Sequence, residues 1–376
     1  MLISQCLAIV GHQGITKRSM SHPSSKYRNQ SSKKPKDWVD AWMDDENVSS
    51  SRRGMKKSKQ ATAQKPDYLP PEAANAIVAE VFPKLCRVKL DETESGMPFE
   101  FLCSYRRANL LGVTGSEYRE RSPVAVGDRV KVTRSSPDSG VIEGLCERRS
   151  RLVRRAPGRD DQKVQHVLAA NVDAVVIVAS LKFPDFSPGL VDRFLIGALS
   201  SSITPILVVT KLDLLSAQDP KPWSIYSDLG FSVREVSVKS RVGLDDLDQE
   251  LRGKTIVFCG KSGAGKTSLL SSLLGESAGR VGDVSDATGK GKHTTTSSIL
   301  LGGPENSQWI DTPGVREFAL TDIAPENLKD FFPEFKRSQC AVENCLHTGE
   351  VNCEGVSIPR YSSYLRIYES LKAGEG

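Results

Sequence analysis

The sequence predicts a multidomain protein with an N-terminal all-β barrel of the OB-fold type, a central α/β domain and a C-terminal helical segment. Three observations predict this class. Residues 75–150 contain short runs in which apolar and polar residues alternate, as in half-buried strands. Residues 165–275 alternate nearly continuous apolar runs with leucines at helical spacing, which is typical of a parallel sheet covered by helices. Three cysteines and a histidine lie within residues 340–353.

The expected division is a leader and linker over residues 1–74, the barrel over 75–150, the α/β domain over 151–320 and the C-terminal domain over 321–376. A chain of 376 residues is long enough for this division. No apolar run approaches the roughly 18 residues of a membrane span, so we expect a soluble protein with no membrane partner. The other five cysteines are scattered, which favours a reducing compartment over a disulfide framework.

The first 36 residues are rich in serine and carry seven basic residues and no acidic one, whereas the remainder of the chain sums to −2. This composition is typical of an organelle transit peptide. Seven serines against two arginines favour the chloroplast stroma slightly over the mitochondrial matrix. A disordered basic tail is the alternative. Residues 37–70 stay polar and charged, and we interpret them as a solvated linker.

The barrel prediction depends on four strand-like runs and two turns. The runs are Ile77–Val81, Cys86–Leu90, Phe99–Cys103 and Arg129–Val132, and the turns are 126–128 and 137–140. About five short strands in this length suggest an OB-fold, which often binds RNA. Six arginines follow the barrel and suit phosphate and base edges, although they would equally form a solvated connector. They are Arg148, Arg149, Arg151, Arg154, Arg155 and Arg159.

The α/β domain is predicted from alternating strands and helices. Runs 174–179, 205–209 and 255–259 are apolar and rich in β-branched residues, as buried strands are. Residues 236–240 are expected to end a further strand. Helices are expected over 189–198, from Gly243 onward, and over 267–274.

A phosphate-binding motif connects the strand 255–259 to the helix 267–274. The sequence reads G-x-x-x-x-G-K-T, in which glycines let backbone N–H groups turn toward phosphate oxygens. Lys266 is expected to reach the β- and γ-phosphates and Thr267 to ligate Mg²⁺. A glycine-rich turn without a ligand is the alternative. The expected contacts are Gly260, Lys261, Ser262, Gly263, Ala264, Gly265, Lys266, Thr267 and Ser268.

The remaining elements of this domain resemble those of a GTPase. Asp-Thr-Pro-Gly at 311–314 is similar to the element that holds Mg²⁺ by its Asp, here Asp311, and senses the γ-phosphate by its Gly, here Gly314. Thr-Lys-Leu-Asp is similar to the guanine-reading element, and Ser237 and Val238 to the loop that closes over the base. The guanine-reading residues would be Thr210, Lys211, Leu212 and Asp213.

These elements stand in an unusual order. In ordinary GTPases the phosphate loop precedes the base-reading elements, whereas here residues 210–239 come before 260–268. The sequence therefore predicts a circularly permuted GTPase domain. Permutation leaves the packing of a sheet intact when the new ends lie in surface loops.

The cysteine cluster reads Cys340-x4-Cys345-x-His347-x5-Cys353. Three thiolates and one imidazole fill a tetrahedron, which predicts one structural zinc ion with no open position for catalysis. Free cysteines in a loop are the alternative. Helices are expected on both sides, over 325–332 and 361–371.

Together, these parts resemble the RsgA-type small-ribosomal-subunit biogenesis GTPases over about residues 75–372, with Gly289-Lys-Gly-Lys-His-Thr-Thr-Thr296 as a specific feature. The resemblance implies GTP hydrolysis with Mg²⁺, GTP and GDP as ligands, and binding to the small ribosomal subunit and its rRNA. The long leader points to an organellar form. Thr210 stands where the family usually has Asn and offers one hydroxyl instead of an amide pair, which predicts a lower guanine affinity.

Catalysis needs a group that orients the attacking water. Many GTPases use a Gln after Asp-x-x-Gly, but this chain has Val315 there. We therefore expect His293 to orient the water, or else only to order its loop, and Thr295 to contact Mg²⁺ and the γ-phosphate, with Lys266 as the third catalytic residue. Intrinsic hydrolysis should be slow and the subunit should stimulate it.

Two other function classes stay open at this stage. One is a different P-loop enzyme, such as an ATPase or a small-molecule kinase, which relaxed base choice at Thr210 would favour. The other is an RNA-binding module whose nucleotide site is structural. A monomer is the default expectation.

Overall fold

The computed structural model describes residues 68–92, 97–105, 119–120, 122–155, 164–275, 298–312, 320, 323–338 and 340–373. The chain divides into two units, Met1–Ala61 and Thr62–Gly376, and every described residue belongs to the second unit. The predicted leader and most of the predicted linker lie outside the described residues. Within the described residues, no helix combines the length and the apolar character that a membrane span requires.

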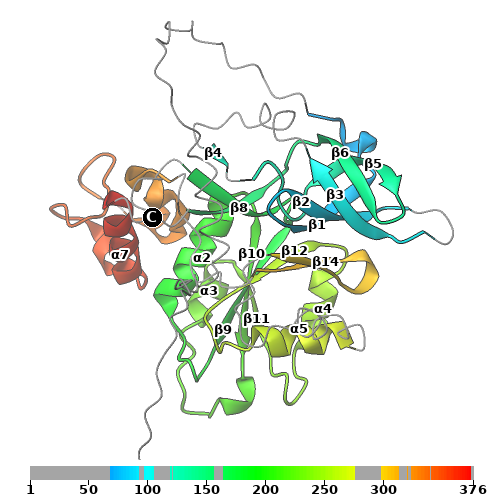
Figure 1. The fold of residues 1–376 in the computed structure, drawn as a ribbon. Coiled ribbons are helices and arrows are strands. Elements are labelled where there is room, and N and C mark those ends of the chain that lie inside the picture. Colours follow the sequence, from blue (N-terminus) through cyan, green and yellow to red (C-terminus); the bar gives the residue numbers. More distant parts are fainter. Residues whose placement is uncertain are drawn as a thin grey trace, which may run out of the picture. The chain divides into compact units, whose positions relative to one another are not determined.

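A closed five-stranded barrel begins the described chain (Figure 1). Its strands are β1 (Ala76–Val81), β2 (Leu85–Leu90), β3 (Glu100–Tyr105), β5 (Arg129–Ser136) and β6 (Ser139–Leu145), in the order β1-β2-β3-β6-β5, with β5 pairing back onto β1. The pairs are antiparallel except β3 with β6. Alternate residues of β2 and β3 are buried, as the period-two pattern predicts. The barrel prediction is confirmed.

The last barrel strand differs from the sequence-based expectation. The turn expected over 137–140 covers only Pro137 and Asp138, and Ser139 already belongs to β6. Gly140 looks like a turn residue, so the sequence does not indicate a strand here. The fold nevertheless requires glycine, because a Cβ at this position would lie 2.7 Å from the Phe101 ring and 2.8 Å from the Thr133 carbonyl oxygen. The glycine therefore serves close packing inside the barrel.

Two arginines of the basic run after the barrel form ion pairs within the protein. Arg148 donates from Nε and Nη2 to the buried Asp128 carboxylate at 2.7 and 2.8 Å. Arg149 donates to Asp173 at 3.0 Å. The run then enters β7 (Arg151–Arg155), which joins β4 (Arg119–Glu120) and β8 (Val164–Ala170) in a separate sheet of order β4-β8-β7. These two arginines are therefore held in ion pairs within the protein, and Arg148 is not part of a solvated connector.

The central sheet has the order β11-β10-β9-β12-β14-β13. Its strands are β9 (Ala174–Ser180), β10 (Thr204–Thr210), β11 (Ser232–Glu235), β12 (Thr255–Cys259), β13 (Ile299–Gly302) and β14 (Gln308–Asp311). Neighbours pair in parallel except β13 with β14. The strand expected to end within 236–240 ends at Glu235, because Ser237 turns to pair with Val242 in an isolated bridge.

Helices cover both faces of this sheet, as its continuous apolar strands predict. On one face, α2 (Pro188–Ser200) and α3 (Ser224–Asp228) bury residues such as Phe194 and Tyr226. On the other face, α4 (Leu244–Leu251) and α5 (Lys266–Leu274) bury Leu247 and Leu270. Both predicted helix positions after Gly243 and after the phosphate loop are confirmed.

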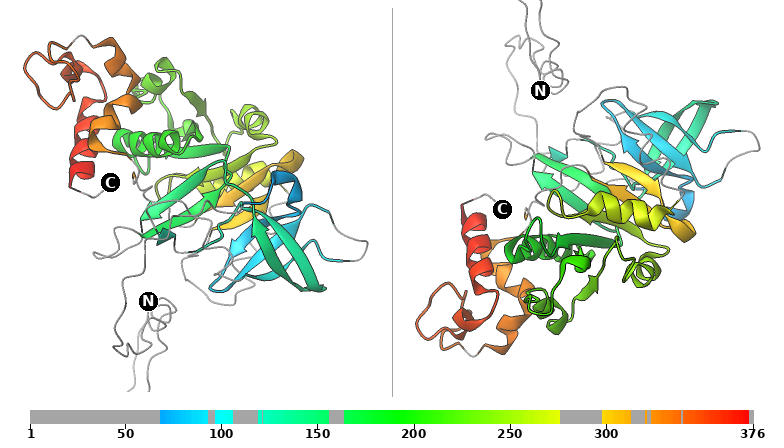
Figure 2. Two further views of the ribbon diagram at one scale, coloured as in Figure 1. Left: turned by 90° about the horizontal axis from the view of Figure 1, so that it is seen from above. Right: turned by 90° about the horizontal axis from the view of Figure 1, so that it is seen from below.

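The C-terminal segment packs against α2. It contains 3₁₀ helices at Pro325–Phe331, Pro333–Arg337 and Glu354–Ser357 and the helix α7 (Tyr361–Lys372). The helix expected over 325–332 is thus a 3₁₀ helix and not an α-helix. Phe332, Phe335 and Tyr364 form a core with Ile196 of α2, and Figure 2 shows the C-terminal helix α7 close to α2.

A buried ion cluster reinforces this packing. Arg360 donates to Asp192 of α2 at 2.9 Å and to both oxygens of Glu334 at 2.6 Å. The side chains of Arg360 and Asp192 are 4% and 0% exposed. The Tyr226 hydroxyl donates to the same Asp192 oxygen at 3.0 Å. Burial raises the pKa of the Asp192 carboxyl, and Arg360 opposes that shift.

Candidate nucleotide-binding site and metal cluster

The candidate nucleotide site lies where the parallel strands β9, β10, β12 and β14 end. In an open α/β sheet, the carboxyl ends of the strands form the ligand-binding edge. Register places Thr210 beside Ser180 and Asp311 beside Phe258, so the base-reading and phosphate-binding segments meet at this edge. Sequence positions that are far apart are therefore neighbours in the fold.

The phosphate-binding loop has the backbone geometry that its glycines predict. Gly260, Gly263 and Gly265 have φ angles of +140°, +81° and +94°. A Cβ on Gly260 would lie 2.1 Å from the Val178 carbonyl oxygen, so only glycine fits against β9 there. Lys261, Ser262, Thr267 and Ser268 are exposed and Ala264 is buried.

Lys266 closes the loop in this structure. Its Nζ donates to the carbonyl oxygens of Gly260 at 2.6 Å and Lys261 at 3.2 Å. Burial lowers the pKa of Lys266, whereas Cys259 and Asp311 act in the opposite direction. Burial raises the pKa of Asp311, and Lys266 opposes this. The ammonium and the carboxylate thus influence each other across the end of the sheet, where a phosphate and its cation would sit.

The base-reading turn, residues 210–215, is attached directly to the phosphate loop. The Thr210 hydroxyl donates to the Ala264 carbonyl at 2.6 Å, and Lys211 Nζ donates to the Gly263 carbonyl at 3.0 Å. Thr210 is buried and has one hydroxyl proton, so this bond leaves it no second donor for a nucleotide. The lower guanine affinity expected from Thr210 stays a prediction.

Ser237 supports the residue expected to read the base. Its hydroxyl donates to Asp213 Oδ1 at 2.7 Å and accepts from the Ser240 N–H at 3.2 Å. Leu212 N–H donates to the Val236 carbonyl at 3.2 Å, which holds the turn against the 236–240 segment. Ser237 is fully buried, so its side chain orients the Asp213 carboxylate. Val238 is partly buried against the adjacent core.

Of four further predicted site residues, the structure describes Asp311 alone. Asp311 ends β14, close to Lys266. His293, Thr295 and Gly314 lie outside the described residues.

The four residues of the predicted metal cluster converge. Their ligand atoms all lie within 4.8 Å of one another. Cys353 Sγ is 3.8 Å from Cys340 Sγ, 3.6 Å from Cys345 Sγ and 3.3 Å from His347 Nδ1. Tetrahedral zinc with Zn–S bonds of about 2.3 Å places two sulfurs about 3.8 Å apart. The donor set and its spacing therefore suggest structural zinc.

Neighbouring residues fix the imidazole of this cluster. Phe335 stacks on His347 with ring centroids 4.1 Å apart and planes 10° apart. On Gly355, a Cβ would lie 2.5 Å from His347 Nδ1. Glu350 accepts from the N–H groups of Leu346 and Thr348 at 2.9 and 2.7 Å. Sequence reasoning missed Phe335, Gly355 and Glu350, because no motif spacing marks residues that support a ligand.

The fold and the site define a class of protein. A phosphate-binding loop and a base-reading turn share one sheet edge, and the turn precedes the loop in the chain. These are the features of a circularly permuted P-loop GTPase.

The comparisons with known proteins identify the family. The family model "RsgA GTPase" matches residues 145–321. The small ribosomal subunit biogenesis GTPase RsgA of Chlorobaculum parvum is 37% identical over 282 residues, which cover 70% of this chain and 91% of that protein. The protein of the same name from Yersinia enterocolitica is 33% identical over 297 residues, covering 75% and 82%. The chain belongs to the RsgA family of GTPases.

Solved structures agree with this assignment. The crystal structure of YjeQ from Thermotoga maritima matches with a TM-score of 0.59 and 28% identity, covering 80% of this chain and 98% of that chain. The crystal structure of YloQ, described as a circularly permuted GTPase, matches with a TM-score of 0.56 and 26% identity, covering 79% and 94%. The order barrel, GTPase domain, cysteine–histidine segment is therefore that of known RsgA-like folds.

Proposed function

We propose that this protein is a GTPase that binds the small ribosomal subunit and its rRNA, couples GTP hydrolysis to late maturation of the subunit, and leaves it after hydrolysis. The observation that carries the proposal is the direct attachment of the base-reading turn to the phosphate loop through Thr210–Ala264 and Lys211–Gly263. It occurs in a chain that matches 91% of a relative named for small-subunit biogenesis.

The proposed nucleotide contacts use the residues described above. Asp213, oriented by Ser237, accepts from the two guanine N–H groups, and the Lys211 stem packs over the base. Residues 260–268 surround the phosphates, with backbone N–H groups and the Lys266 ammonium. Lys266 leaves the Gly260 carbonyl to reach the β- and γ-phosphates. Val238, Leu212 and Gly314 complete the proposed set, Gly314 at the γ-phosphate.

Two metals fit the residues present. Thr267 is exposed at the start of α5 and Asp311 ends β14, so both would hold Mg²⁺, which neutralises phosphate charge when bound with GTP. The four residues of the cysteine–histidine cluster would hold one zinc ion, which supplies stability and no reaction chemistry. Gly355 and Phe335 keep Nδ1 of His347 directed at that position.

Hydrolysis depends on a water that the chain must orient. Val315 cannot hold it, so we assign this role to His293, with Thr295 ordering the same loop around the γ-phosphate. Binding to the subunit orders that loop and stimulates turnover. His293→Ala should abolish stimulation while leaving GDP affinity unchanged, and full stimulated turnover in that variant would remove His293 from the mechanism.

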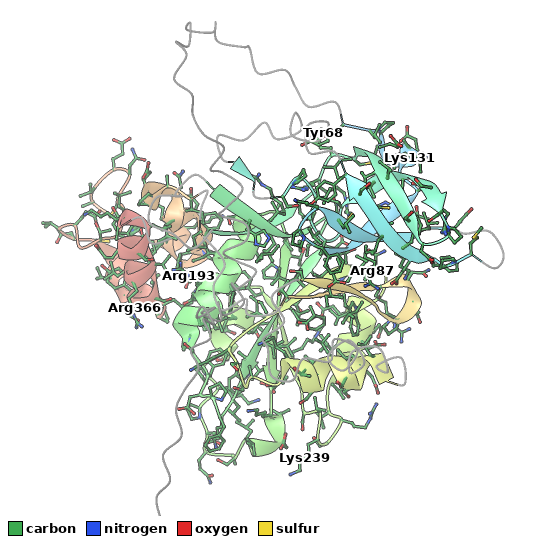
Figure 3. All side chains as sticks on the ribbon, viewed as in Figure 1. Tyr68, Arg87, Lys131, Arg193, Lys239 and Arg366 are labelled. Carbon is green, nitrogen blue, oxygen red and sulfur yellow. The ribbon has the colours of Figure 1, made fainter. Side chains whose placement is uncertain are left out.

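The barrel is the proposed rRNA-binding part. Arg87 on β2 and Lys131 on β5 are exposed and project from it (Figure 3), and OB-folds bind RNA through such faces. We propose that the protein acts as a monomer. The basic, acid-free residues 1–36 support import into an organelle, with the chloroplast stroma slightly favoured over the mitochondrial matrix.

The first experiment is steady-state hydrolysis by the full chain, alone and with isolated small ribosomal subunits, using GTP and ATP. Stimulation of GTP turnover by the small subunit but not by the large subunit is the expected result. Equal turnover with and without subunits would contradict the proposed partner. Equal use of ATP would favour a different P-loop enzyme, the alternative that the single hydroxyl of Thr210 supports.

Localisation has its own test. Residues 1–74 fused to a fluorescent protein are incubated with isolated chloroplasts and mitochondria. Protease-protected, shortened fusion in chloroplasts is the expected result, and a fusion that stays full-length and protease-sensitive with both organelles would contradict the organellar proposal.

A further inference from the structure

The segment between β9 and α2, residues 181–187, contacts both halves of the nucleotide site, and no sequence motif marks it. We name it the connecting loop. Pro184, Asp185 and Phe186 line a small cavity together with Gly260 and Lys261 of the phosphate loop. A Cβ on Gly263 would touch the Pro184 ring at 3.4 Å. The connecting loop therefore lies directly against the phosphate loop.

The backbone of the connecting loop also holds the base-reading lysine. Lys211 Nζ donates to the carbonyl oxygens of Lys182, at 3.3 Å, and of Phe183. The same ammonium donates to Gly263. Three carbonyl oxygens from two loops thus fix the far end of Lys211. The stem that packs over the base depends on the position of the connecting loop.

The side chain of Lys182 reaches the opposite end of the base-reading turn. Its Nζ donates to the Leu214 carbonyl at 3.2 Å and to Asp219 Oδ2 at 2.7 Å. Leu214 ends the single 3₁₀ turn Leu212–Leu214 that carries Asp213. The last carbonyl of a helical turn has no partner within the turn, and a cation there is favourable.

Asp219 completes the arrangement. Its Oδ2 accepts from the Ser216 N–H at 2.7 Å as well as from Lys182, and its own N–H donates to the Ser216 carbonyl at 3.1 Å. Asp219 thus ties the chain that leaves the base-reading turn back to Lys182. The side chains of Lys182 and Asp219 are 36% and 22% exposed, so solvent weakens the pair without removing it.

From these contacts we infer that Lys182 and Asp219 are positioning residues for guanine recognition: Lys182 fixes Lys211 through its backbone and the Asp213 turn through its side chain. The inference rests on the proposed base-reading role of Asp213. The Lys182 contacts add to the bond from the Thr210 hydroxyl, whose single proton is donated to Ala264.

Isothermal titration calorimetry of the full chain with GDP, ADP and pyrophosphate tests the inference. We expect Lys182→Ala and Asp219→Ala each to weaken GDP binding about 3- to 10-fold, as loss of a half-exposed charged pair allows. Pyrophosphate and ADP affinities should stay unchanged, because the phosphate loop keeps its own bonds. The loss in the double variant should be smaller than the sum of the two single losses, because both single variants remove the Lys182–Asp219 bond, and Lys182→Arg should retain most of the affinity.

Lys221→Ala is the matched control, because Lys221 pairs with Glu235 at 3.1 Å with similar exposure and makes no hydrogen bond to the base-reading turn. It should leave all three affinities unchanged. Unchanged GDP affinity in Lys182→Ala, or an equal loss for GDP and pyrophosphate, would overturn the inference. Asp213→Ala separates the two levels: if it also leaves the preference for GDP over ADP intact, the base-reading assignment itself fails.

Discussion

At the residue scale, one glycine decides whether the phosphate loop can form. Gly260 combines a φ of +140° with a Cβ direction that ends 2.1 Å from the Val178 carbonyl oxygen. Any side chain there meets strain in its own backbone and a collision with a buried strand. The motif therefore requires glycine for the fit against β9 as well as for phosphate access.

We expect Gly260→Ala to cost about 2–4 kcal/mol of unfolding free energy, from strain and overpacking together, and to abolish GDP binding. Urea denaturation and titration calorimetry measure the two effects. Gly253→Ala is the control, because Gly253 has a φ of +67° but no atom near its Cβ position. It should cost about 1 kcal/mol and keep GDP affinity. Equal costs would show that packing against β9 is unimportant.

A second prediction at this scale concerns pH. The hydrogen bond from Lys182 lowers the pKa of the Asp219 carboxyl to about 2, and the Ser216 N–H adds to the shift. Because this value lies below the unfolded-state value of about 3.9, the contribution of the pair is complete above about pH 4 and is lost as pH falls toward 2. The GDP-affinity loss in Lys182→Ala should therefore be equal at pH 6 and pH 8.

NMR titration of the Asp219 carboxyl provides the direct measurement. Its midpoint should rise in Lys182→Ala and stay low in Lys221→Ala. A midpoint in the ordinary aspartate range for the unaltered protein would contradict the ion pair.

Much of the site could be predicted residue by residue, because a nearby motif marks it. Residues 260–268 and the metal cluster are each predicted from a motif with short spacing. In the structure the phosphate loop leads into α5, and the four cluster residues converge. Lys182 and Asp219 could not be found in this way. They are 37 residues apart, and each alone is an ordinary charged residue in a loop. Their pairing depends on how β9 and β10 lie side by side.

At the element scale, the cysteine–histidine cluster depends on tight packing around its imidazole. A Cβ on Gly355 would overlap the His347 ring. The Phe335 ring stacks on the same imidazole, with ring centroids 4.1 Å apart. Among its described residues, the segment 338–359 has the short 3₁₀ helix Glu354–Ser357 and otherwise turns and loops, so we expect its order to depend on the ligands and these two neighbours. Short segments of this kind depend on their metal.

Gly355→Ala should therefore weaken zinc binding at least about 10-fold, because the new methyl group displaces a ligand. Competition with a chromogenic chelator measures the affinity. Val356→Ala is the control, since Val356 is exposed and adjacent. GDP binding should survive in both variants, because no ligand residue touches the phosphate loop. Unchanged zinc affinity in Gly355→Ala would show that the segment relaxes around the methyl group.

Sequence patterns predicted elements best where one periodicity dominated. The strands β9, β10 and β12 are uniformly apolar and were placed within two residues of their ends. The sequence patterns do not predict β6 and β7, for two different reasons. β6 contains Gly140 and Gly144, which look like turn residues, and β7 places Leu152 and Val153 among arginines that suggest a solvated connector. Only the surrounding barrel and sheet show why these residues extend.

At the scale of the whole molecule, a strand pair and an ion cluster are among the contacts that join the three described parts. The pair Glu80↔Ile299 connects barrel strand β1 to β13 at the edge of the central sheet. The Arg360–Asp192–Glu334 cluster joins the C-terminal segment to α2. The connecting loop leads from β9 into α2, so the residues that hold Lys211 and those that hold the C-terminal segment belong to one continuous stretch.

Arg360→Ala should cost about 3–5 kcal/mol, because it leaves the buried Asp192 and Glu334 carboxylates without their cation. Thermal unfolding should then show the C-terminal segment separating from the GTPase domain at lower temperature. Arg366→Ala is the control on the same helix, where Arg366 is exposed and bonds only to the Ser362 carbonyl among the contacts described (Figure 3). Equal melting behaviour of the two variants would contradict a structural role for the cluster.

The long separation within this ion cluster also affects how the chain is made. Arg360 follows Asp192 by 168 residues, and translation at about 5–20 residues per second puts roughly 10–30 s between them. During that interval Asp192 has Tyr226 but not Arg360 as a partner, and Ile196 of α2 lacks the aromatic residues that later cover it. The nascent GTPase domain therefore exposes Ile196 and leaves Asp192 without its cation until the C-terminal segment is synthesised.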